Sequence, residues 1–306
     1  SIRRQRQMCI RDRGWNYPTG RGTWNGIFYP LPEDRSRGFD ELAFYAERFN
    51  VVEVNSTFYG QPRANVALGW ARRTPASFEF AIKLYQKFTH PGMTTDATPV
   101  SQADVDAFKG GIDPLAAAGK LGPILAQFPS SFRHSPEAVA YLDWLMRTFA
   151  SYTLAVELRH ASWSDAGDDT RAQLATGNAA WVQIDEPKFA ASIRQELSAA
   201  AGDLLYLRLH GRNARQWWDH DQAEDRYNYH YSTQELALIA SQVRQAQAAK
   251  KAYLLLNNHF SAQAVANATT LKKMLDEPVT AALPSEFVER YPELEGVATL
   301  PRARLL

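Results

Sequence analysis

The stretch Val51-Val52-Glu53-Val54-Asn55-Ser56-Thr57-Phe58-Tyr59 decides the fold, because it begins as a buried strand and ends in polar side chains. Valine at positions 51, 52 and 54 is typical of a strand that is buried on both faces. Glu53 interrupts this run, and a carboxylate in a buried strand costs free energy unless it is ion-paired or hydrogen-bonded. The residues alone leave two interpretations of Glu53 open: a structural salt bridge or a functional group.

Two later stretches, 153–159 and 204–211, repeat this arrangement of an apolar run that ends in charged side chains. The charged residues and histidines at their ends are Glu157, Arg159, His160, Arg208 and His210. Apolar runs of similar length predict further strands at 78–84, 122–129, 179–187 and 251–259. The chain therefore contains seven visible strands.

Helices are predicted between these strands, and the alternation indicates the fold class. The predicted helices span 39–49, 65–73, 101–118, 136–149, 233–250 and 261–275. Asp40 and Glu41 favour the first turn of the first helix, and the predicted N-caps are Ser101 with Asp104 three residues on, Ser135, and Thr233. Strands that are separated by helices form right-handed parallel crossovers. With an eighth strand position within residues 1–13, the pattern predicts a (β/α)8 TIM-type barrel. A doubly wound open sheet is the alternative, but the sequence lacks the glycine-rich phosphate loop of that fold.

Residues 1–13 need a separate interpretation, because they show no strand periodicity. Gln7 to Asp12 resembles the translation of a sequencing adapter, so we expect 1–13 to be a non-native or disordered arm where the first strand was lost or replaced. A genuine basic arm is the alternative. We expect one barrel domain over 14–275 and a C-terminal tail over 276–306.

Charge and cysteine usage narrow the possible functions. Residues 1–13 contain five Arg and one Asp, so the net charge falls from +1 to −3 without them. Neither value favours binding to a DNA duplex or an anionic membrane. Cys9 is the only cysteine, so the rest of the chain has no thiol for a disulfide, a thiolate zinc site or a cysteine nucleophile. No apolar run approaches about 20 residues, so we expect a soluble protein without a membrane span.

Polar residues at the ends of the predicted strands form the candidate site, because functional groups of parallel barrels gather at the C-terminal ends of the strands. Alternate residues of a strand share one direction, so we expect Glu53 to point with Asn55 and Thr57 on a strand that runs to 57. In the same way Glu157 points with Arg159, and Arg208 with His210. The predicted catalytic residues are Glu53, Glu157 and His210. The predicted substrate-binding residues are Asn55, Thr57, Tyr59, Lys83, Gln127, Arg159, His160, Trp163, Asp185, Arg208 and Asn257.

These side chains suit acid–base work on a small polar or anionic substrate. Arg159 and Arg208 would hold a carboxylate or phosphate, because guanidinium binds either in bidentate fashion. His210 is the best general acid–base candidate, since its ordinary pKa is nearest neutrality. A divalent metal on the carboxylates and His210 is possible, but no short ligand motif is present and no metal ligand is assigned. Structural ion pairs, a hydrogen-bonded His210 and aromatic residues used only for packing remain the alternative interpretations.

At this point several motifs in order resemble one family, the domain of unknown function 72 family, over about 14–275. The motifs are Gly14-Trp15-Asn16-Tyr17, Phe28-Tyr29-Pro30, Glu53 to Tyr59, Phe80-Ala81-Ile82-Lys83, Val156 to His160 with Ser162-Trp163, Leu207 to Gly211, and Asn257-Asn258. The resemblance implies a TIM-type barrel and a bacterial or archaeal cytoplasmic protein, and it implies no activity. The family's Gly-Thr-Ser-Gly-Trp segment after the first strand is replaced here by Asp12-Arg13-Gly14-Trp15.

Three functions remain open. The first is an enzyme, of hydrolase, lyase or isomerase type, that uses carboxylates and histidine at the C-terminal mouth of the barrel. The second is a metal-dependent enzyme acting on nucleic acid or nucleotides, with aromatic loops 15–29 and 217–231 stacking on bases. The third is a ligand-binding barrel without catalysis.

Overall fold

The strands of the computed structural model form two parallel sheets. The structure describes residues 7–12, 14–15, 17, 20–93, 98–195, 203–215, 217, 223–246, 248–279 and 281–297. One sheet has the order β1 (Gln7–Asp12), β9 (Lys251–Leu256), β8 (Leu204–Leu209) and β7 (Gln183–Asp185). The other has the order β2 (Val51–Val54), β3 (Glu79–Lys83), β4 (Leu121–Gln127), β5 (Leu154–Glu157) and β6 (Ala179–Trp181).

The predicted strand 179–187 is divided between the two sheets and connects them. Its first half, β6, pairs with β5, and the N–H of Val182 still donates to the carbonyl of Val156 at 2.9 Å. Its second half, β7, pairs with β8, where Ile184 is opposite Arg208. The two sheets are therefore consecutive along one stretch of chain that changes partner at Val182.

The parallel α/β class that the sequence predicted is confirmed, whereas the pairings do not show a closed barrel. Among the described residues no strand ladder joins β1 to β2. Asn50, the residue before β2, donates from Nδ2 to the carbonyl of Met8 in β1 at 2.9 Å. The coarser description, two parallel sheets surrounded by helices, is the one that these pairings support.

β1 lies in the segment for which no strand periodicity was found. It pairs with β9 along its whole length, from Gln7 opposite Lys251 to Asp12 opposite Leu256. Main-chain hydrogen bonds make this pairing, and they depend little on side-chain alternation. The segment therefore occupies the position of a first strand.

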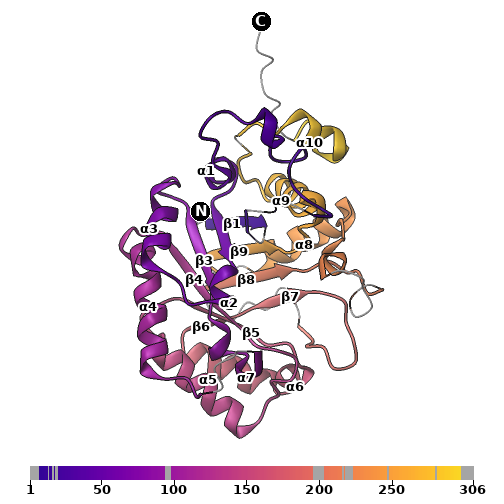
Figure 1. Cartoon of the computed structure of the whole chain (residues 1–306). Coiled ribbons are helices and arrows are strands. Elements are labelled where there is room, and N and C mark those ends of the chain that lie inside the picture. Colours follow the sequence, from indigo (N-terminus) through magenta and orange to yellow (C-terminus); the bar gives the residue numbers. More distant parts are fainter. Residues whose placement is uncertain are drawn as a thin grey trace, which may run out of the picture.

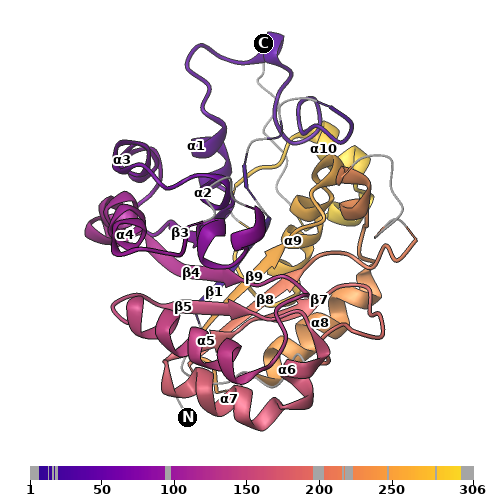
Figure 2. The same cartoon turned by 60° about the horizontal axis from the view of Figure 1, so that its bottom comes forward.

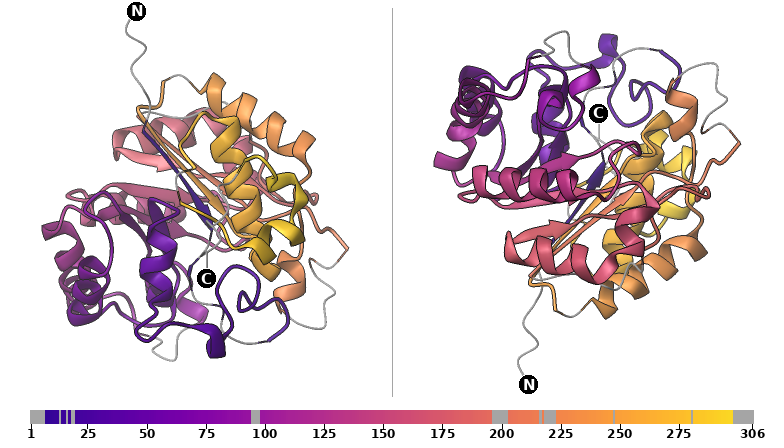
Figure 3. Two further views of the ribbon diagram at one scale, coloured as in Figure 1. Left: turned by 90° about the horizontal axis from the view of Figure 1, so that it is seen from above. Right: turned by 90° about the horizontal axis from the view of Figure 1, so that it is seen from below.

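Helices lie outside the strands, as Figures 1 and 2 show, with α3 to α5 beside the sheet that contains β2 to β6 and α8 and α9 beside the other. Figure 3 shows the same arrangement from both ends. The helices are α1 (Glu41–Ala46), α2 (Ser56–Tyr59), α3 (Ala64–Arg72), α4 (Gln102–Ala117), α5 (Pro136–Thr148), α6 (Ala161–Asp165), α7 (Gly167–Thr176), α8 (Thr233–Gln245), α9 (Gln263–Met274) and α10 (Ser285–Arg290). Short 3-10 turns span Pro32–Asp34, Gln86–Phe88, Pro91–Met93, Ala223–Tyr227, Phe260–Ala262 and Pro292–Leu294.

Capping side chains begin the long helices largely where the sequence indicated. Ser101 and Asp104 form a reciprocal capping box at α4, and Ser135 caps α5. At α8 the cap is Ser232, paired with Glu235, so the prediction of Thr233 was wrong by one residue. The Ser-x-x-Glu spacing explains the shift, because Glu235 reaches back to the main-chain N–H of Ser232.

The strand predicted through Thr57 is shorter than expected. β2 ends at Val54 and the chain turns into α2. The hydroxyl of Thr57 donates to the carbonyl of Lys83 at 2.6 Å, a bond that holds this turn against the end of β3. Strand alternation therefore does not continue past Val54, and the inference that Asn55 and Thr57 share the direction of Glu53 was wrong.

The predicted C-terminal tail contains α10, which packs against the loop that precedes α1. The fully buried ring of Phe287 lies 5.7 Å from that of Phe28. The hydroxyl of Tyr291 donates to the carbonyl of Ser261 at 2.5 Å. Within the part of the chain that the structure describes, no helix has the length and apolar character needed to cross a membrane.

Candidate active site

Four inward-facing residues form an ion-paired group between the strands, here called the interior cluster: Glu53, Gln127, Glu157 and Arg208. Register brings them together, because Gln127 of β4 is opposite Glu157 of β5. Arg208 of β8 binds Glu53 in bidentate fashion, with Nη2 donating to Oε1 at 2.7 Å and Nε to Oε2 at 3.1 Å. Its Nη1 donates to Glu157 Oε2 and to Gln127 Oε1.

The three charged residues of the interior cluster are closed to solvent and their charges are compensated. Glu53, Glu157 and Arg208 are each 0% exposed. Burial alone would raise the pKa of Glu157, but Arg208 and Arg159 hold that pKa well below its usual range. Burial likewise opposes the charge of Arg208, and Glu157 and Glu53 raise its pKa above the ordinary value. The cluster therefore stays ionised, and its guanidinium is engaged by protein carboxylates.

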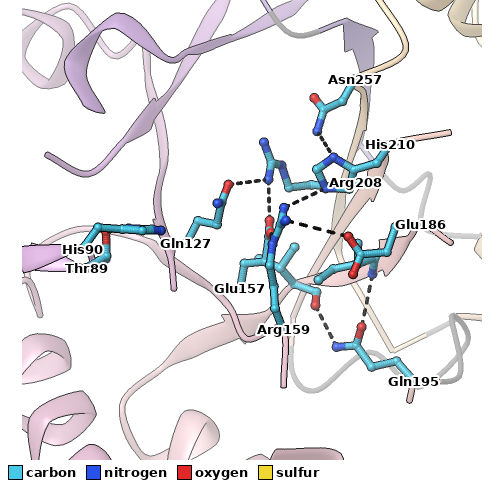
Figure 4. A network of polar contacts seen from close by, with 12 residues as sticks. Thr89, His90, Gln127, Glu157, Arg159, Glu186, Gln195, Arg208, His210 and Asn257 are labelled. Carbon is cyan, nitrogen blue, oxygen red and sulfur yellow. Dashed lines mark hydrogen bonds and ion pairs between the residues drawn. The ribbon is translucent and has the colours of Figure 1, made fainter. Parts of the chain in front are cut away.

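One layer further out, four residues form the mouth cluster: Arg159, Glu186, His210 and Asn257. They directly or closely follow β5, β7, β8 and β9, so they meet at the C-terminal ends of the strands. Figure 4 shows their side chains converging beside the interior cluster. Arg159 joins the two groups, since its Nε donates to Glu157 Oε1 at 2.7 Å.

The guanidinium of Arg159 is loosely held on its outer side. Its Nη1 lies 3.9 Å from Glu186 Oε2, and its Nη2 lies 3.5 Å from His210 Nε2. The side chain is 22% exposed, in contrast to the fully buried Arg208. A planar set of N–H donors with long contacts and access to solvent is suited to binding a carboxylate or phosphate.

Glu186 and His210 flank this guanidinium. Burial raises the pKa of Glu186 above its ordinary value, and the attraction of Arg159 opposes that effect only in part. His210 is buried, its main-chain N–H donates to the carbonyl of Asp185 at 2.8 Å, and its Nδ1 lies 3.0 Å from Asn257 Nδ2. The site thus combines a cation, a carboxyl group that favours protonation, and an imidazole.

His90 and Glu186 belong to this region, although neither was among the predicted site residues. Burial and the charges of Lys83 and Arg159 lower the pKa of His90 to about 4, so its imidazole is neutral at physiological pH. Figure 4 shows the ring directed towards Gln127. The sequence could have predicted Glu186, because it is two residues after Ile184, which is opposite the inward-facing Arg208. His90 is in a loop, where no periodicity marks it.

Several predicted site residues have structural contacts instead. His160 Nδ1 accepts from the N–H of Ser162 at 3.1 Å and so caps α6. Trp163 is fully buried, and its Nε1 donates to the carbonyl of Phe132 at 2.8 Å. Asp185 accepts from Arg212 Nη2 at 2.6 Å and from the Tyr231 hydroxyl at 2.9 Å. Thr57 is used in the turn described above.

Three predicted residues remain: Lys83, Asn55 and Tyr59. Lys83 is buried at the end of β3, with Nζ 4.0 Å from the centre of the Phe58 ring. Asn55 Nδ2 donates to the carbonyl of Glu53 at 3.4 Å. Tyr59 is 67% exposed on α2. Asn16, Trp218 and His220, which the sequence motifs and loops included, lie outside the described residues.

No metal centre can be assembled from the described residues, since nowhere among them do three His, Cys, Asp or Glu side chains come together as possible ligands. Three of the carboxylates considered for this role, Glu53, Glu157 and Asp185, are paired with arginines. The side chains available for chemistry at the mouth are therefore those of Arg159, Glu186 and His210.

Comparison with known proteins places the chain within a recognised family. A family model described as a protein of unknown function, DUF72, matches residues 13–289. The UPF0759 protein YunF of Bacillus subtilis is 28% identical over 279 residues, which cover 88% of this chain and 97% of that protein. A solved structure of a DUF72 family protein from Thermotoga maritima has a TM-score of 0.73 at 31% identity, covering 89% of this chain and 100% of that one. Another, from Enterococcus faecalis, has a TM-score of 0.69 at 28% identity, covering 78% and 94%.

Proposed function

The chain belongs to the DUF72 family, and from the geometry of the mouth cluster we propose that it is an enzyme that performs acid–base chemistry on a small anionic substrate. Arg159 binds the carboxylate or phosphate of that substrate. Glu186 and His210 exchange protons with an atom next to the bound anion. Arg208 of the interior cluster fixes the carboxylate of Glu157, which in turn accepts from Arg159 and holds its guanidinium in place.

The long outer contacts of Arg159 carry this proposal. A guanidinium satisfied by protein carboxylates, such as that of Arg208, has little free-energy gain left for a ligand. Arg159 keeps one short bond, to Glu157, while the contacts of its two Nη atoms are 3.9 and 3.5 Å long. An anion that forms two short bonds to these atoms gains the charge-assisted interaction that the protein leaves incomplete.

The two neighbours of Arg159 supply the acid–base groups. A buried carboxyl whose pKa is raised retains its proton nearer to neutral pH and acts as a proton donor. His210 acts as the acceptor, since neutral imidazole has a lone pair on one ring nitrogen. Together they support proton removal and return at a hydroxyl or acidic C–H beside the anion, or the acid step of a hydrolysis.

Anion binding is tested by calorimetric titration with inorganic phosphate and with malonate. Arg159→Met should weaken binding of the better anion at least about tenfold, because a bidentate charged hydrogen bond is lost. Arg194→Met is the matched control, since Arg194 is an exposed arginine that pairs with Asp165 outside the cluster. Equal affinity of wild type and Arg159→Met would overturn the assignment of Arg159.

Catalysis is tested separately with a panel of hydroxy, amino and keto carboxylates and sugar phosphates. Compounds that bind are incubated with the protein in D2O and examined by NMR. Deuterium incorporation or conversion that is lost in His210→Gln supports the enzyme. Binding with neither exchange nor conversion across the panel would favour the ligand-binding barrel instead.

Two broader expectations belong to the same proposal. We propose that the two sheets close into a TIM-type barrel, with the hydrogen bond from Asn50, which precedes β2, to Met8 of β1 as support. We also propose a cytoplasmic location, as the family resemblance suggested. Cell fractionation tests the second point.

A further inference from the structure

We infer that Asn257 is a positioning residue that fixes neutral His210 as the tautomer with its hydrogen on Nδ1. The lone pair of Nε2 then faces Arg159 and the anion bound there. This inference rests on the proposed function for its purpose: the lone pair would receive the hydrogen of a hydroxyl or acidic C–H adjacent to the bound anion. The substrate class becomes an anion with such a donor on the neighbouring atom.

The donors and acceptors available on Asn257 and His210 support this assignment of the tautomer. When Asn257 donates from Nδ2 to Nδ1, the neutral ring must carry its hydrogen on Nε2. That N–H would then point at the guanidinium N–H groups of Arg159, whose Nη2 is 3.5 Å away. Two donors would face each other. In the same arrangement Asn257 Oδ1 is buried and has no hydrogen-bond partner among the described residues.

A half turn of the Asn257 amide about its last side-chain bond removes the clash of donors and gives Oδ1 a partner, while Nδ2 takes the former place of Oδ1. Nitrogen and oxygen of an amide exchange places with almost no change in shape, so the hydrogen-bonding partners decide between the two orientations. In the turned orientation Oδ1 accepts from Nδ1–H, and Nε2 accepts from Arg159 Nη2. Each ring nitrogen of His210 then has a complementary partner on the described residues.

The fold supports this pairing with main-chain contacts. The N–H of Asn257 donates to the carbonyl of Leu209 at 2.6 Å, which places its side chain beside His210. The carbonyl of Asn257 lies 3.0 Å from His259 Nδ1, a contact that further fixes this turn after β9. Asn257 is fully buried, so solvent does not compete for its amide.

Long-range proton–nitrogen NMR correlation of 15N-histidine-labelled full-length protein tests the inference, with His210→Gln used to assign the ring signals. Wild type should show the hydrogen of His210 on Nδ1. Asn257→Leu should move it to Nε2, the nitrogen that free imidazole side chains prefer in water. Asn257→Asp should retain the Nδ1–H form, because a carboxylate also accepts from Nδ1.

The wild-type spectrum alone keeps the inference falsifiable if Asn257→Leu does not fold. A wild-type ring with its hydrogen on Nε2 would overturn it, and so would an Asn257→Leu spectrum identical to that of wild type. Phosphate affinity of wild type and of Arg159→Met tests the proposed function separately, because the anion is bound by Arg159. A wild-type ring with its hydrogen on Nε2, in a protein that still binds phosphate through Arg159, would contradict this inference and leave the proposed function standing.

Discussion

The interior cluster and the mouth cluster contain the same kinds of side chain, yet their contacts differ. In the interior, Arg208 binds two fully buried carboxylates through short bonds. At the mouth, Arg159 binds one carboxylate closely and has only long contacts with Glu186 and His210. The contacts around an arginine, more than its presence, therefore distinguish a structural ion pair from a candidate binding site.

Depth along the strand produces the difference. Glu157 and Arg159 are two residues apart, as are Arg208 and His210, and a strand rises about 3.3 Å per residue. The second member of each pair therefore lies roughly 6.6 Å nearer the C-terminal face than the first. The first members fill an inner layer of the sheets, as in barrel interiors, and the second members reach the mouth.

The largest expected effect comes from breaking the interior cluster. Arg208→Met leaves Glu53 and Glu157 buried without their main counter-charge and should lower the free energy of unfolding by about 3–5 kcal/mol. Urea unfolding followed by circular dichroism measures this. Arg159→Met is the matched comparison and should cost less, because Glu157 keeps Arg208. Similar losses in the two variants would remove the distinction between scaffold and site.

A smaller effect should separate the two clusters by pH. The pKa of Glu157 is depressed in the fold, so its ionised form stabilises the protein above its ordinary pKa of 4.5, and this contribution is lost as the pH falls below that value. The pKa of Glu186 is raised, so the stability that its protonated form contributes is present below 4.5 and is lost as the pH rises through the raised pKa.

The corresponding variants should therefore differ in sign at pH 8. Glu157→Gln should be less stable than wild type at pH 8 and approach it near pH 3. Glu186→Gln should match wild type near pH 4 and exceed it at pH 8. Unfolding free energies across this range check both expectations. If the two substitutions shifted stability in the same direction at pH 8, the contrast in their environments would be refuted.

Much of the fold could be predicted from the sequence, because apolar runs and capping residues are local signals. Ser101 with Asp104 and the runs around β3, β4 and β8 led to the correct elements. The position of β1 was predicted, but its strand was expected to be lost or replaced, because its pairing with β9 is a main-chain interaction that side-chain periodicity does not reveal. α2 was missed because the hydroxyl of Thr57 bonds to β3, a contact that no local pattern shows.

The sequence predicted which residues converge, but it did not predict which of them are buried in the inner layer and which reach the mouth. The sequence indicated that Glu53, Glu157, Arg208 and His210 would converge. Side-chain alternation predicts which face of a strand a side chain points to. It does not predict which residue of a pair such as Glu157 and Arg159 is buried beneath the other. His90 was missed because it lies in a loop, and Asp185 was preferred to Glu186 although alternation with Ile184 favours the latter.

The central claim is that an anion binds at Arg159 and not at Arg208. The most direct test follows the side-chain Nε–Hε NMR signals of arginine while the wild-type protein is titrated with inorganic phosphate. The signal of Arg159 is assigned by its absence in Arg159→Met. The signal of Arg159 should move saturably, and that of Arg208 should stay in place. A shift of Arg208 as large as that of Arg159, or no shift of Arg159 at saturating phosphate, would contradict the claim.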